Sequence, residues 1–309
     1  MSSITILRDD GPVPAEAAVQ AAVRQAFEQL AAGRAVQPRQ VVTDLPDGGD
    51  VIAYQAVLAD AGVYAVKVSP YLPQPAGKAV VTAWTLLLST RTGQPLLLAD
   101  SARLTTERTA ATTALAVDLL ARPDAHRLAV IGLGPVGRAH LRHARVVRRF
   151  TEVRMWSRTA TEADLDGLGG DVHLAASADE AAAGADVVLL CTSAAAPVVD
   201  ARRLAPGSLI TSVSTNAPMA HEIDPAVLGN LDVYADYAPA AFAAGGEMRL
   251  AAAEHGFTLT DIRGDLAGLL AGAAPAPTGA RPVFFRSVGL GIEDAAVALA
   301  ALRILETSS

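Results

Sequence analysis

The stretch LAVIGLGPVGRAH, residues 128–140, decides which fold the sequence predicts. An apolar run ends at Gly132, and Gly134 and Gly137 follow at the spacing G-x-G-x-x-G. When such glycines lie between a strand and a helix, the first permits a tight turn, the second lets a pyrophosphate approach the backbone, and the third lets helix and strand pack closely. A purely structural turn is the alternative, but the strands that follow favour a dinucleotide-binding unit.

Pro135 and Val136 begin the helix that follows this turn. Proline at the first helical position costs no hydrogen bond, and the free N–H groups and positive dipole end of the helix suit phosphate. We therefore expect both residues to contact the cofactor together with the glycines. Further along, the arginines between residues 138 and 149, and also His140 and His143, are expected to lie on the exposed surface of the helix.

Further apolar segments of strand length follow the glycine turn. They are EVRMWS (152–157), DVHLA (171–175), DVVLLCT (186–192), SLITSV (208–213) and LDVYAD (231–236). Segments of helix or loop length separate them, and this alternation is typical of a parallel sheet covered on both faces. The predicted fold class is α/β, with a Rossmann-type doubly wound parallel sheet.

The residues after the second of these strands indicate which dinucleotide binds. An NAD site usually has Asp or Glu there to hold the ribose 2′-hydroxyl, whereas this chain has Ser157, Arg158 and Thr159. An arginine flanked by hydroxyl groups suits a 2′-phosphate, which needs charge-assisted donors. We expect NADP(H) in preference to NAD(H), with a solvated surface arginine as the alternative.

The chain before residue 121 has a different pattern. Residues 14–33 predict an amphipathic helix that ends at a glycine, and short strands follow to about residue 100, with a hairpin turn at residues 91–93. A long helix over residues 105–121 closes the region. This pattern predicts an α+β domain in addition to the dinucleotide-binding one.

Two cations in this first region occupy unusual positions. Lys67 lies inside an apolar strand, where lysine is usually avoided unless it is paired or functional. Arg108 falls in the first turn of the predicted helix, the unfavourable end for a cation, which suggests a bound anion beside it. Arg39 shows no such feature, and its spacing alone indicates a surface residue. Together the three cations could bind a carboxylate.

The composition excludes several classes of protein. The chain has 309 residues, 51% of them hydrophobic, which is enough for one large or two ordinary globular domains, and two are expected. A net charge of −7 and a pI near 5.4 argue against a nucleic-acid or anionic-membrane partner, because both need a basic face. Cys191 is the only cysteine, and no spacing indicates a metal site. Without a signal or membrane-spanning segment, a soluble cytoplasmic protein is expected.

Two motifs resemble those of the ornithine cyclodeaminase/mu-crystallin family. They are the T-x-x-R-T-A-A core at residues 105–111 and FFRSVGLGIEDAAVA at residues 284–298. The glycine motif lies between them at the right distance, and Lys67 falls where the family has its lysine. The resemblance covers almost the whole chain.

The resemblance implies a role for each of the three cations. Arg39, in place of the family's P-P-R arginine, would bind the substrate α-carboxylate together with Lys67 and Arg108. Lys67 would also lie close to the reacting nitrogen or carbon. The partner of the protein is then a small imino or amino acid.

The resemblance also implies the cofactor geometry and the domain organisation. The nicotinamide end would lie near Thr192, Ser214, Ser287 and Val288. The C-terminal segment would return to the N-terminal half. A discontinuous α+β substrate-binding and dimerisation domain would then comprise residues 1–121 and 284–309, with the NADP-binding Rossmann domain over residues 122–283. A homodimer through the first domain is expected.

The stretch TSVSTNAPMAHEID, residues 211–224, departs from the cyclodeaminase pattern. Aligning Pro218 and Glu222 on the family's proline and glutamate puts Asn216 where cyclodeaminases carry an aspartate. An amide cannot take up a proton as a carboxylate does, so acid–base work on an amine is disfavoured there. His221 and Glu222 are expected in a solvent-facing loop and helix start rather than in a proton relay.

This form resembles the ketimine reductase branch of the family, which reduces Δ1-pyrroline-2-carboxylate and Δ1-piperideine-2-carboxylate to proline and pipecolate. It implies NADPH-dependent hydride transfer to a cyclic imine, with Lys67 and Asn216 as the catalytic candidates. An ornithine or lysine cyclodeaminase and an amino-acid dehydrogenase of the same fold are alternatives. A non-catalytic NADPH-dependent ligand-binding protein of the mu-crystallin kind is another.

Overall fold

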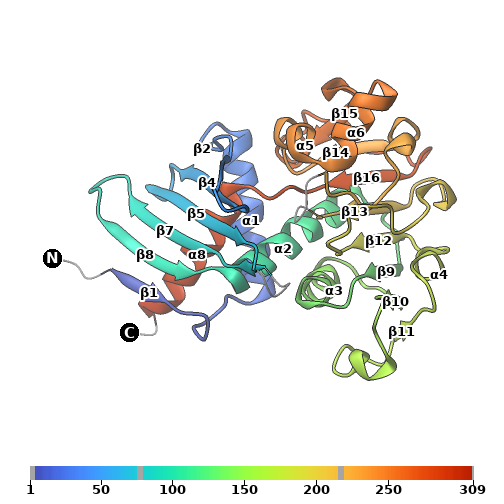
Figure 1. Cartoon of the computed structure of the whole chain (residues 1–309), viewed down its shortest axis with the longest axis horizontal. Coiled ribbons are helices and arrows are strands. Elements are labelled where there is room, and N and C mark those ends of the chain that lie inside the picture. The colour runs from blue at the N-terminus through green and yellow to red at the C-terminus, as the bar shows by residue number, and fades with distance from the viewer. Residues whose placement is uncertain (1–3, 75–78, 215–218, 308–309) are drawn as a thin grey trace. The chain divides into compact units, whose positions relative to one another are not determined.

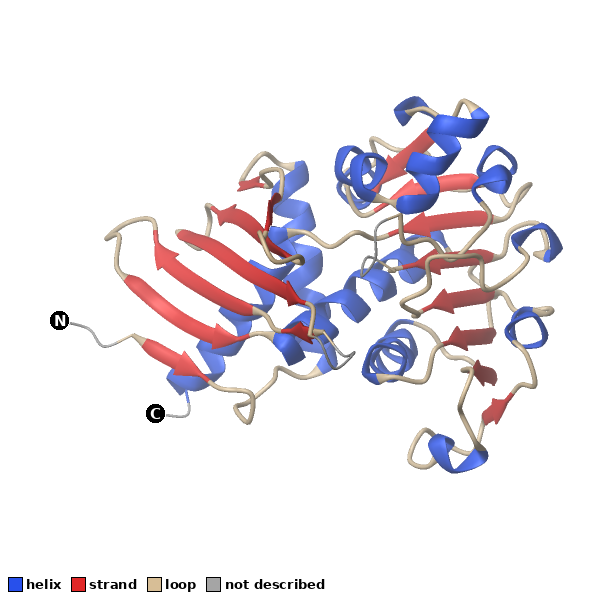
Figure 2. Ribbon diagram, viewed as in Figure 1, coloured by secondary structure: helices blue, strands red, loops and turns tan. Residues whose placement is uncertain are grey.

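The chain divides into two compact units in this computed structural model, which describes residues 4–74, 79–214 and 219–307 (Figures 1 and 2). Unit 1 comprises residues 1–108 and 289–309, and unit 2 comprises residues 109–288. Unit 1 therefore contains both ends of the chain. No helix in the described ranges is long and apolar enough to cross a membrane.

Unit 1 is built on an eight-stranded sheet, sheet A, with the order β1-β8-β7-β5-β4-β2, to which β3 adds at β4 and β6 at β5. The strands are β1 (Thr5–Leu7), β2 (Ala35–Val36), β3 (Val41–Asp44), β4 (Asp50–Leu58), β5 (Val63–Leu72), β6 (Val80–Val81), β7 (Trp84–Ser89) and β8 (Pro95–Asp100). Only β1 and β8 pair in parallel; the other pairs are antiparallel. Gly93, with φ +70°, closes the β7–β8 hairpin by donating its N–H to the Ser89 carbonyl, which confirms the predicted turn.

Helix α8 (Gly291–Thr307) packs along one face of sheet A and against α1 (Glu16–Ala31) (Figure 1). Side chains alternate between the two faces of a strand. In β5, Val63, Ala65 and Lys67 are buried, whereas Val68 is exposed. The alternation therefore directs Lys67 into the interior of unit 1 and its neighbour Val68 to the opposite face.

Helix α2 (Ala102–Leu120) begins three residues earlier than the sequence pattern predicts. Arg108 consequently lies in the second turn and not in the first, so the argument from the helix dipole was wrong in its premise. The division between the units falls within this helix, at residues 108/109 rather than at the expected 121/122.

Unit 2 contains a second eight-stranded sheet, sheet B, with the order β11-β10-β9-β12-β13-β16-β14-β15. Its strands are β9 (Arg127–Ile131), β10 (Glu152–Trp156), β11 (Val172–Leu174), β12 (Val187–Leu190), β13 (Leu209–Ser212), β14 (Asp232–Ala235), β15 (Ile262–Asp265) and β16 (Val283–Arg286). Every pair is parallel, which confirms the predicted α/β class. The strands β12, β13, β14 and β16 are buried at every position, as in a sheet covered on both faces.

Residues 284–286 of strand β16 were expected in the substrate domain, but the whole strand pairs with β13 and β14 inside sheet B. Val283, Phe284 and Phe285 are fully buried there, so this apolar run is stabilised by its two neighbouring strands. The second boundary of the units accordingly lies at residues 288/289 rather than at the expected 283/284.

Helix α3 (Pro135–Val147) packs against β9 and β12. Its two histidines are buried, not on the surface as the sequence analysis expected. His140 explains why: its ring contacts the Val136 carbonyl at 2.8 Å and the Thr113 hydroxyl at 3.0 Å, so both nitrogens are satisfied inside the protein.

Candidate functional site

The glycine turn between β9 and α3 has the geometry that a pyrophosphate needs. Gly132 has φ +117°, and a Cβ there would lie 2.6 Å from the Cys191 carbonyl oxygen. A Cβ on Gly137 would overlap the carbonyl oxygen of Gly132. Gly134 is the N-cap of α3, Pro135 follows at the helix start, and no side chain caps the free N–H groups. The N-terminus of α3 is therefore open to an anion.

Two alanine substitutions distinguish packing from cofactor binding at this turn. A Cβ on Gly134 would meet nothing within 4 Å, and its φ of −69° suits any residue. We expect Gly134→Ala to keep the melting temperature but to weaken NADPH binding about 10-fold or more, because the methyl group occupies the approach of the pyrophosphate. Gly137→Ala should instead destabilise the fold by about 1–3 kcal/mol through overpacking. Thermal melts and NADPH titrations measure both effects; equal melting temperatures for the two variants would contradict the assignment.

The residues after β10 lack a carboxylate that could hold a ribose 2′-hydroxyl. Arg158 and Thr159 are exposed directly after the strand. The next acidic side chains belong to a short 3₁₀ helix (Glu162–Leu165), where the Asp164 carboxylate accepts hydrogen bonds from the N–H and hydroxyl of Thr161. That carboxylate is therefore engaged in capping its own helix.

A buried carboxylate joins the carboxyl ends of β12 and β13. Glu222 is fully buried and accepts hydrogen bonds from the N–H and hydroxyl of Thr192 at 2.9 and 2.6 Å. It also accepts from the Ser212 hydroxyl at 2.8 Å and from the N–H groups of Val213 and Ser214, each at 3.1 Å. The expectation of a solvent-facing Glu222 was wrong, because these donors satisfy its charge in the interior.

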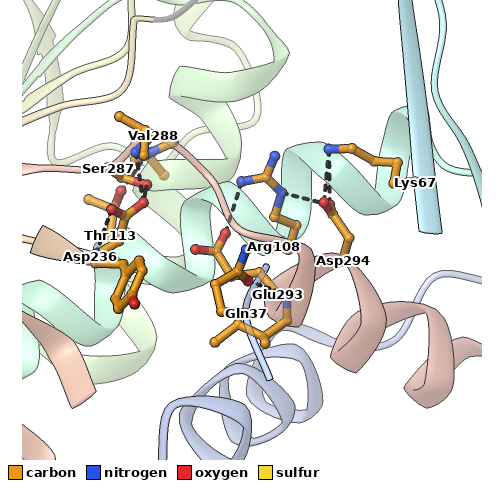
Figure 3. Close-up of polar contacts among 12 residues, drawn as sticks. Gln37, Lys67, Arg108, Thr113, Asp236, Ser287, Val288, Glu293 and Asp294 are labelled. Atoms are coloured by element: carbon orange, nitrogen blue, oxygen red, sulfur yellow. Dashed lines mark hydrogen bonds and ion pairs between the residues drawn. The ribbon is translucent and has the colours of Figure 1, made fainter. Parts of the chain in front are cut away.

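A second buried carboxylate, that of Asp236, holds the carboxyl end of β16. Asp236, fully buried after β14, accepts hydrogen bonds from the Ser287 hydroxyl at 2.9 Å and the Val288 N–H at 2.7 Å (Figure 3). The Ser287 N–H donates in turn to the Ser212 carbonyl. The four residues that the sequence analysis assigns to the nicotinamide end thus lie at the carboxyl ends of neighbouring strands, where open α/β sheets bind their ligands.

A buried arginine underlies this edge of sheet B. Arg286 has no exposed surface and donates hydrogen bonds to the Ser212 hydroxyl and the Ser214 carbonyl. Its Nε lies 3.2 Å from Oε1 of Glu247, which is also fully buried. Burial raises the pKa of the Glu247 carboxyl, and the charge of Arg286 opposes that shift.

A cluster of four charged side chains, which we call the Lys67 cluster, lies inside unit 1 (Figure 3). The Lys67 ammonium lies 3.1 and 3.0 Å from the two carboxylate oxygens of Asp294 and 4.2 Å above the Tyr54 ring centroid. Arg108 donates from Nε to Asp294 at 3.0 Å and from Nη1 to Glu293 at 2.8 Å. The structure therefore brings Lys67 and Arg108 together, and the anion expected beside Arg108 is supplied by the chain itself.

The charges of the Lys67 cluster set its protonation. Burial lowers the pKa of Lys67 to about 8, against the opposing effect of the Asp294 charge. Burial also acts to lower the pKa of Arg108, but Asp294 and Glu293 reverse this effect and raise it. Arg108 thus stays charged, whereas Lys67 can give up a proton near neutral pH.

Arg39 and Asn216 are the other two candidates. Arg39 is exposed in the loop between β2 and β3 and forms no salt bridge with any described residue. Asn216 lies outside the described residues.

Six buried charged residues of these networks were not identified from the sequence as functional candidates. They are Glu222, Asp236, Glu247, Arg286, Glu293 and Asp294. A local signal existed for two of them, because Glu293 and Asp294 are adjacent acids in the first turn of α8, which the helix dipole favours. Their partners, however, are far away in the sequence.

Comparisons with known proteins agree with this geometry. A model of the ornithine cyclodeaminase/mu-crystallin family matches residues 14–304. The NAD(P)H-dependent anabolic L-arginine dehydrogenase DauB of Pseudomonas aeruginosa is 52% identical over 287 residues, which covers 92% of this chain and 91% of that protein.

Solved structures show the same fold over nearly the whole chain. The Δ1-pyrroline-2-carboxylate reductase of Thermococcus litoralis, in complex with NADH and L-proline, has a TM-score of 0.91 at 26% identity and covers 99% of this chain and 98% of its own. An archaeal alanine dehydrogenase dimer with bound NAD has a TM-score of 0.90 at 25% identity, with coverage of 99% and 97%. The chain belongs to the ornithine cyclodeaminase/mu-crystallin family.

Proposed function

We propose that this NAD(P)H-dependent oxidoreductase, which acts on carbon–nitrogen bonds, reduces the C=N bond of a 2-imino acid to the corresponding amino acid. Unit 2 binds the reduced cofactor at the glycine turn, and unit 1 binds the imino acid at the Lys67 cluster. Hydride from the nicotinamide goes to the imine carbon, and a proton goes to the imine nitrogen. The products are the amino acid and the oxidised cofactor.

The observation that carries this proposal is the pair of buried cations, Lys67 and Arg108, on the one carboxylate of Asp294. Burial lowers the pKa of Lys67 to about 8, and Arg108 stays charged. Reduction of an imine needs one proton donor and a cation for the carboxylate, and these two side chains supply them. Lys67 and Arg108 are balanced by Glu293 and Asp294, so the cluster itself is neutral. Arg39 would add the positive charge that matches one substrate carboxylate.

The preferred substrate is the linear imine that ammonia forms with the 2-oxo acid of arginine. The 52% identity to an L-arginine dehydrogenase supports this choice. Cyclic ketimines are the second candidate, supported by the likeness to a Δ1-pyrroline-2-carboxylate reductase and by the S-T-N-A-P form at residues 214–218. Both substrates present a C=N bond next to a carboxylate, so the same two cations serve either.

An NADPH oxidation assay tests the proposal. Wild-type protein is given the 2-oxo acid of arginine with ammonium or, separately, Δ1-pyrroline-2-carboxylate. We expect turnover with both, and the higher kcat/KM with the first. Ammonia release from ornithine or lysine, without turnover of either imine, would contradict imine reduction and favour a cyclodeaminase. NADPH binding without any turnover would favour a ligand-binding protein.

The cofactor we propose is NADP(H), because Arg158 replaces the acidic residue that an NAD site usually carries. We expect Arg158→Ala to weaken NADPH binding about 10- to 100-fold, since an exposed charge-assisted contact with the 2′-phosphate is lost. The NADH affinity of the same variant, which lacks that phosphate, serves as the control and should barely change. Fluorescence titration measures both; an equal loss for the two cofactors would assign Arg158 a role other than phosphate binding.

We also propose a homodimer that buries the face of sheet A opposite α8. That face carries exposed apolar side chains from three strands, with Ile6 52%, Val68 36% and Trp84 41% exposed. Exposed apolar side chains on one face of a sheet are typical of subunit interfaces. The archaeal alanine dehydrogenase of the same fold is described as a dimer. Sedimentation equilibrium tests the proposal, and a monomer at micromolar concentration would contradict it.

A further inference from the structure

Asp294 is the only residue of the Lys67 cluster that contacts both cations. Its Oδ1 accepts from Lys67 Nζ at 3.1 Å and from Arg108 Nε at 3.0 Å, and its Oδ2 lies 3.0 Å from Lys67 Nζ. The Glu293 carboxylate accepts a hydrogen bond from Arg108 Nη1, at 2.8 Å. One carboxylate therefore fixes the distance between the two cations.

The N–H groups of Lys67 and Arg108 that do not bind Asp294 or Glu293 could bind a substrate. An ammonium group has three N–H donors and a guanidinium has five. Lys67 donates one hydrogen bond to Asp294, and Arg108 donates from Nε and Nη1. Among the described residues, no hydrogen bond engages Nη2 of Arg108. Each cation thus keeps at least one N–H free for a ligand.

The backbone holds Asp294 rigidly in this position. Gly291 begins α8 so close to β4 that a Cβ would overlap the Gln55 carbonyl oxygen. Gly289, with φ +79°, leaves room for the Arg108 guanidinium, which a Cβ would also overlap. Asp294 lies in the first turn of α8, where the helix dipole favours a negative charge. The carboxylate is therefore held on a rigid element and not on a loop.

We infer that Asp294 is a positioning residue for imine reduction: it holds the Lys67 ammonium and the Arg108 guanidinium at the separation at which one protonates the imine nitrogen and the other binds the carboxylate. The inference rests on the proposed function and adds a residue to it. Asp294 touches neither the substrate nor the cofactor, and it acts through the two cations.

The groups around Lys67 determine how its pKa would change if the charge of Asp294 were removed. The charged or titratable groups that influence Lys67 are Arg108 on α2, Glu293 and Asp294 on α8, and Tyr54 on β4. Burial raises the pKa of the Tyr54 hydroxyl to about 12, so it stays neutral. Without the Asp294 charge, burial and Arg108 would both disfavour the Lys67 cation. Asp294→Asn keeps the size of the side chain and should lower the pKa of Lys67.

The chain offers a direct measurement, because Lys78 is its only other lysine. In protein labelled with [13Cε]lysine, the Lys78→Arg variant assigns the two NMR signals, and a pH titration gives the midpoint for Lys67. We expect a midpoint near pH 8 in the wild type, lowered by about one to three units in Asp294→Asn. Glu293→Gln is the matched control, since the Glu293 carboxylate is hydrogen-bonded to Arg108 and has a smaller effect on the pKa of Lys67 than Asp294 has, and it should lower the midpoint by less.

Two results would overturn the inference: an unchanged midpoint in Asp294→Asn, or an equal drop in Glu293→Gln. The titration needs no substrate, so it separates a failure of this inference from a failure of the proposed function. In active protein, the basic limb of the kcat/KM profile should move with the midpoint.

If Asp294→Asn does not fold, Asp294→Glu replaces it. This variant keeps the charge but displaces it, so kcat should fall about 10- to 100-fold at an unchanged KM for NADPH. An unchanged kcat would overturn the inference.

Discussion

Replacing Lys67 by methionine is expected to lower kcat/KM for imine reduction by about 10²- to 10⁴-fold while NADPH affinity stays unchanged. The substitution removes the ammonium but keeps an unbranched apolar stem in the interior position that Lys67 occupies between Tyr54 and Asp294. The proton donor proposed for the imine nitrogen is thereby lost. The proposed cofactor contacts belong to residues of unit 2, so the substitution should leave them unaltered.

Lys78→Met is the matched control, because it removes the other lysine of the chain. It should keep full activity, and thermal melts of both variants exclude global unfolding. Retained turnover in Lys67→Met at a normal melting temperature would rule Lys67 out as the donor. The wild-type pH profile gives an independent check. Burial lowers the pKa of Lys67 to about 8, and only the protonated form can donate, so kcat/KM should be level below that pH and fall above it.

The parts of the fold that the sequence predicts are those with local causes. The glycine turn is recognisable because the backbone requires glycine at Gly132 and Gly137 and Gly134 leaves the approach to the turn open, and each central strand is a continuous apolar run. Lys67 stands out for the same reason, since a cation in an apolar strand breaks the pattern around it. These signals lie within a few residues of the feature that they predict.

The parts that the sequence does not predict depend on distant partners. Asp294 binds Lys67 across 227 positions and Arg108 across 186. Glu222 is interpreted as a solvent-facing acid from its neighbours, yet it is buried because five donors from β12 and β13 and the residues after them converge on it. Strand β16 follows β15 in the chain but lies between β13 and β14. No local pattern encodes such an insertion.

A large loss of stability is expected when Arg286 is replaced by methionine, about 3–5 kcal/mol in the free energy of unfolding of unit 2. Arg286 and Glu247 are both fully buried and form an ion pair at 3.2 Å. The substitution leaves Glu247 without its counter-charge in the interior, and it removes the hydrogen bonds to Ser212 and Ser214. Breaking one side of a buried pair costs more than the pair itself contributes, because the remaining charge is uncompensated.

The stability of the Arg286→Met variant should depend on pH through the Glu247 carboxyl. Burial raises the pKa of this carboxyl, and Arg286 normally opposes the shift, so the pKa should rise further in Arg286→Met. When the pKa of a carboxyl is higher in the folded than in the unfolded state, the protein loses stability as the pH rises from the unfolded pKa toward the folded pKa. The difference in the free energy of unfolding between the wild type and Arg286→Met should therefore become smaller as the pH falls toward the ordinary pKa of a glutamate. It should become larger at higher pH.

The double variant Arg286→Met, Glu247→Gln tests this account, because it removes both charges. Replacing a whole buried pair is often nearly neutral, so the double variant should recover a large part of the stability. Trp84→Phe in every background leaves Trp156 on β10 as the sole tryptophan, and its fluorescence in a denaturant titration reports on unit 2. If the double variant is as unstable as Arg286→Met alone, the buried charge is not the cause. The loss then lies in the hydrogen bonds that Arg286 donates to Ser212 and Ser214, at the edge of sheet B where the nicotinamide is proposed to bind.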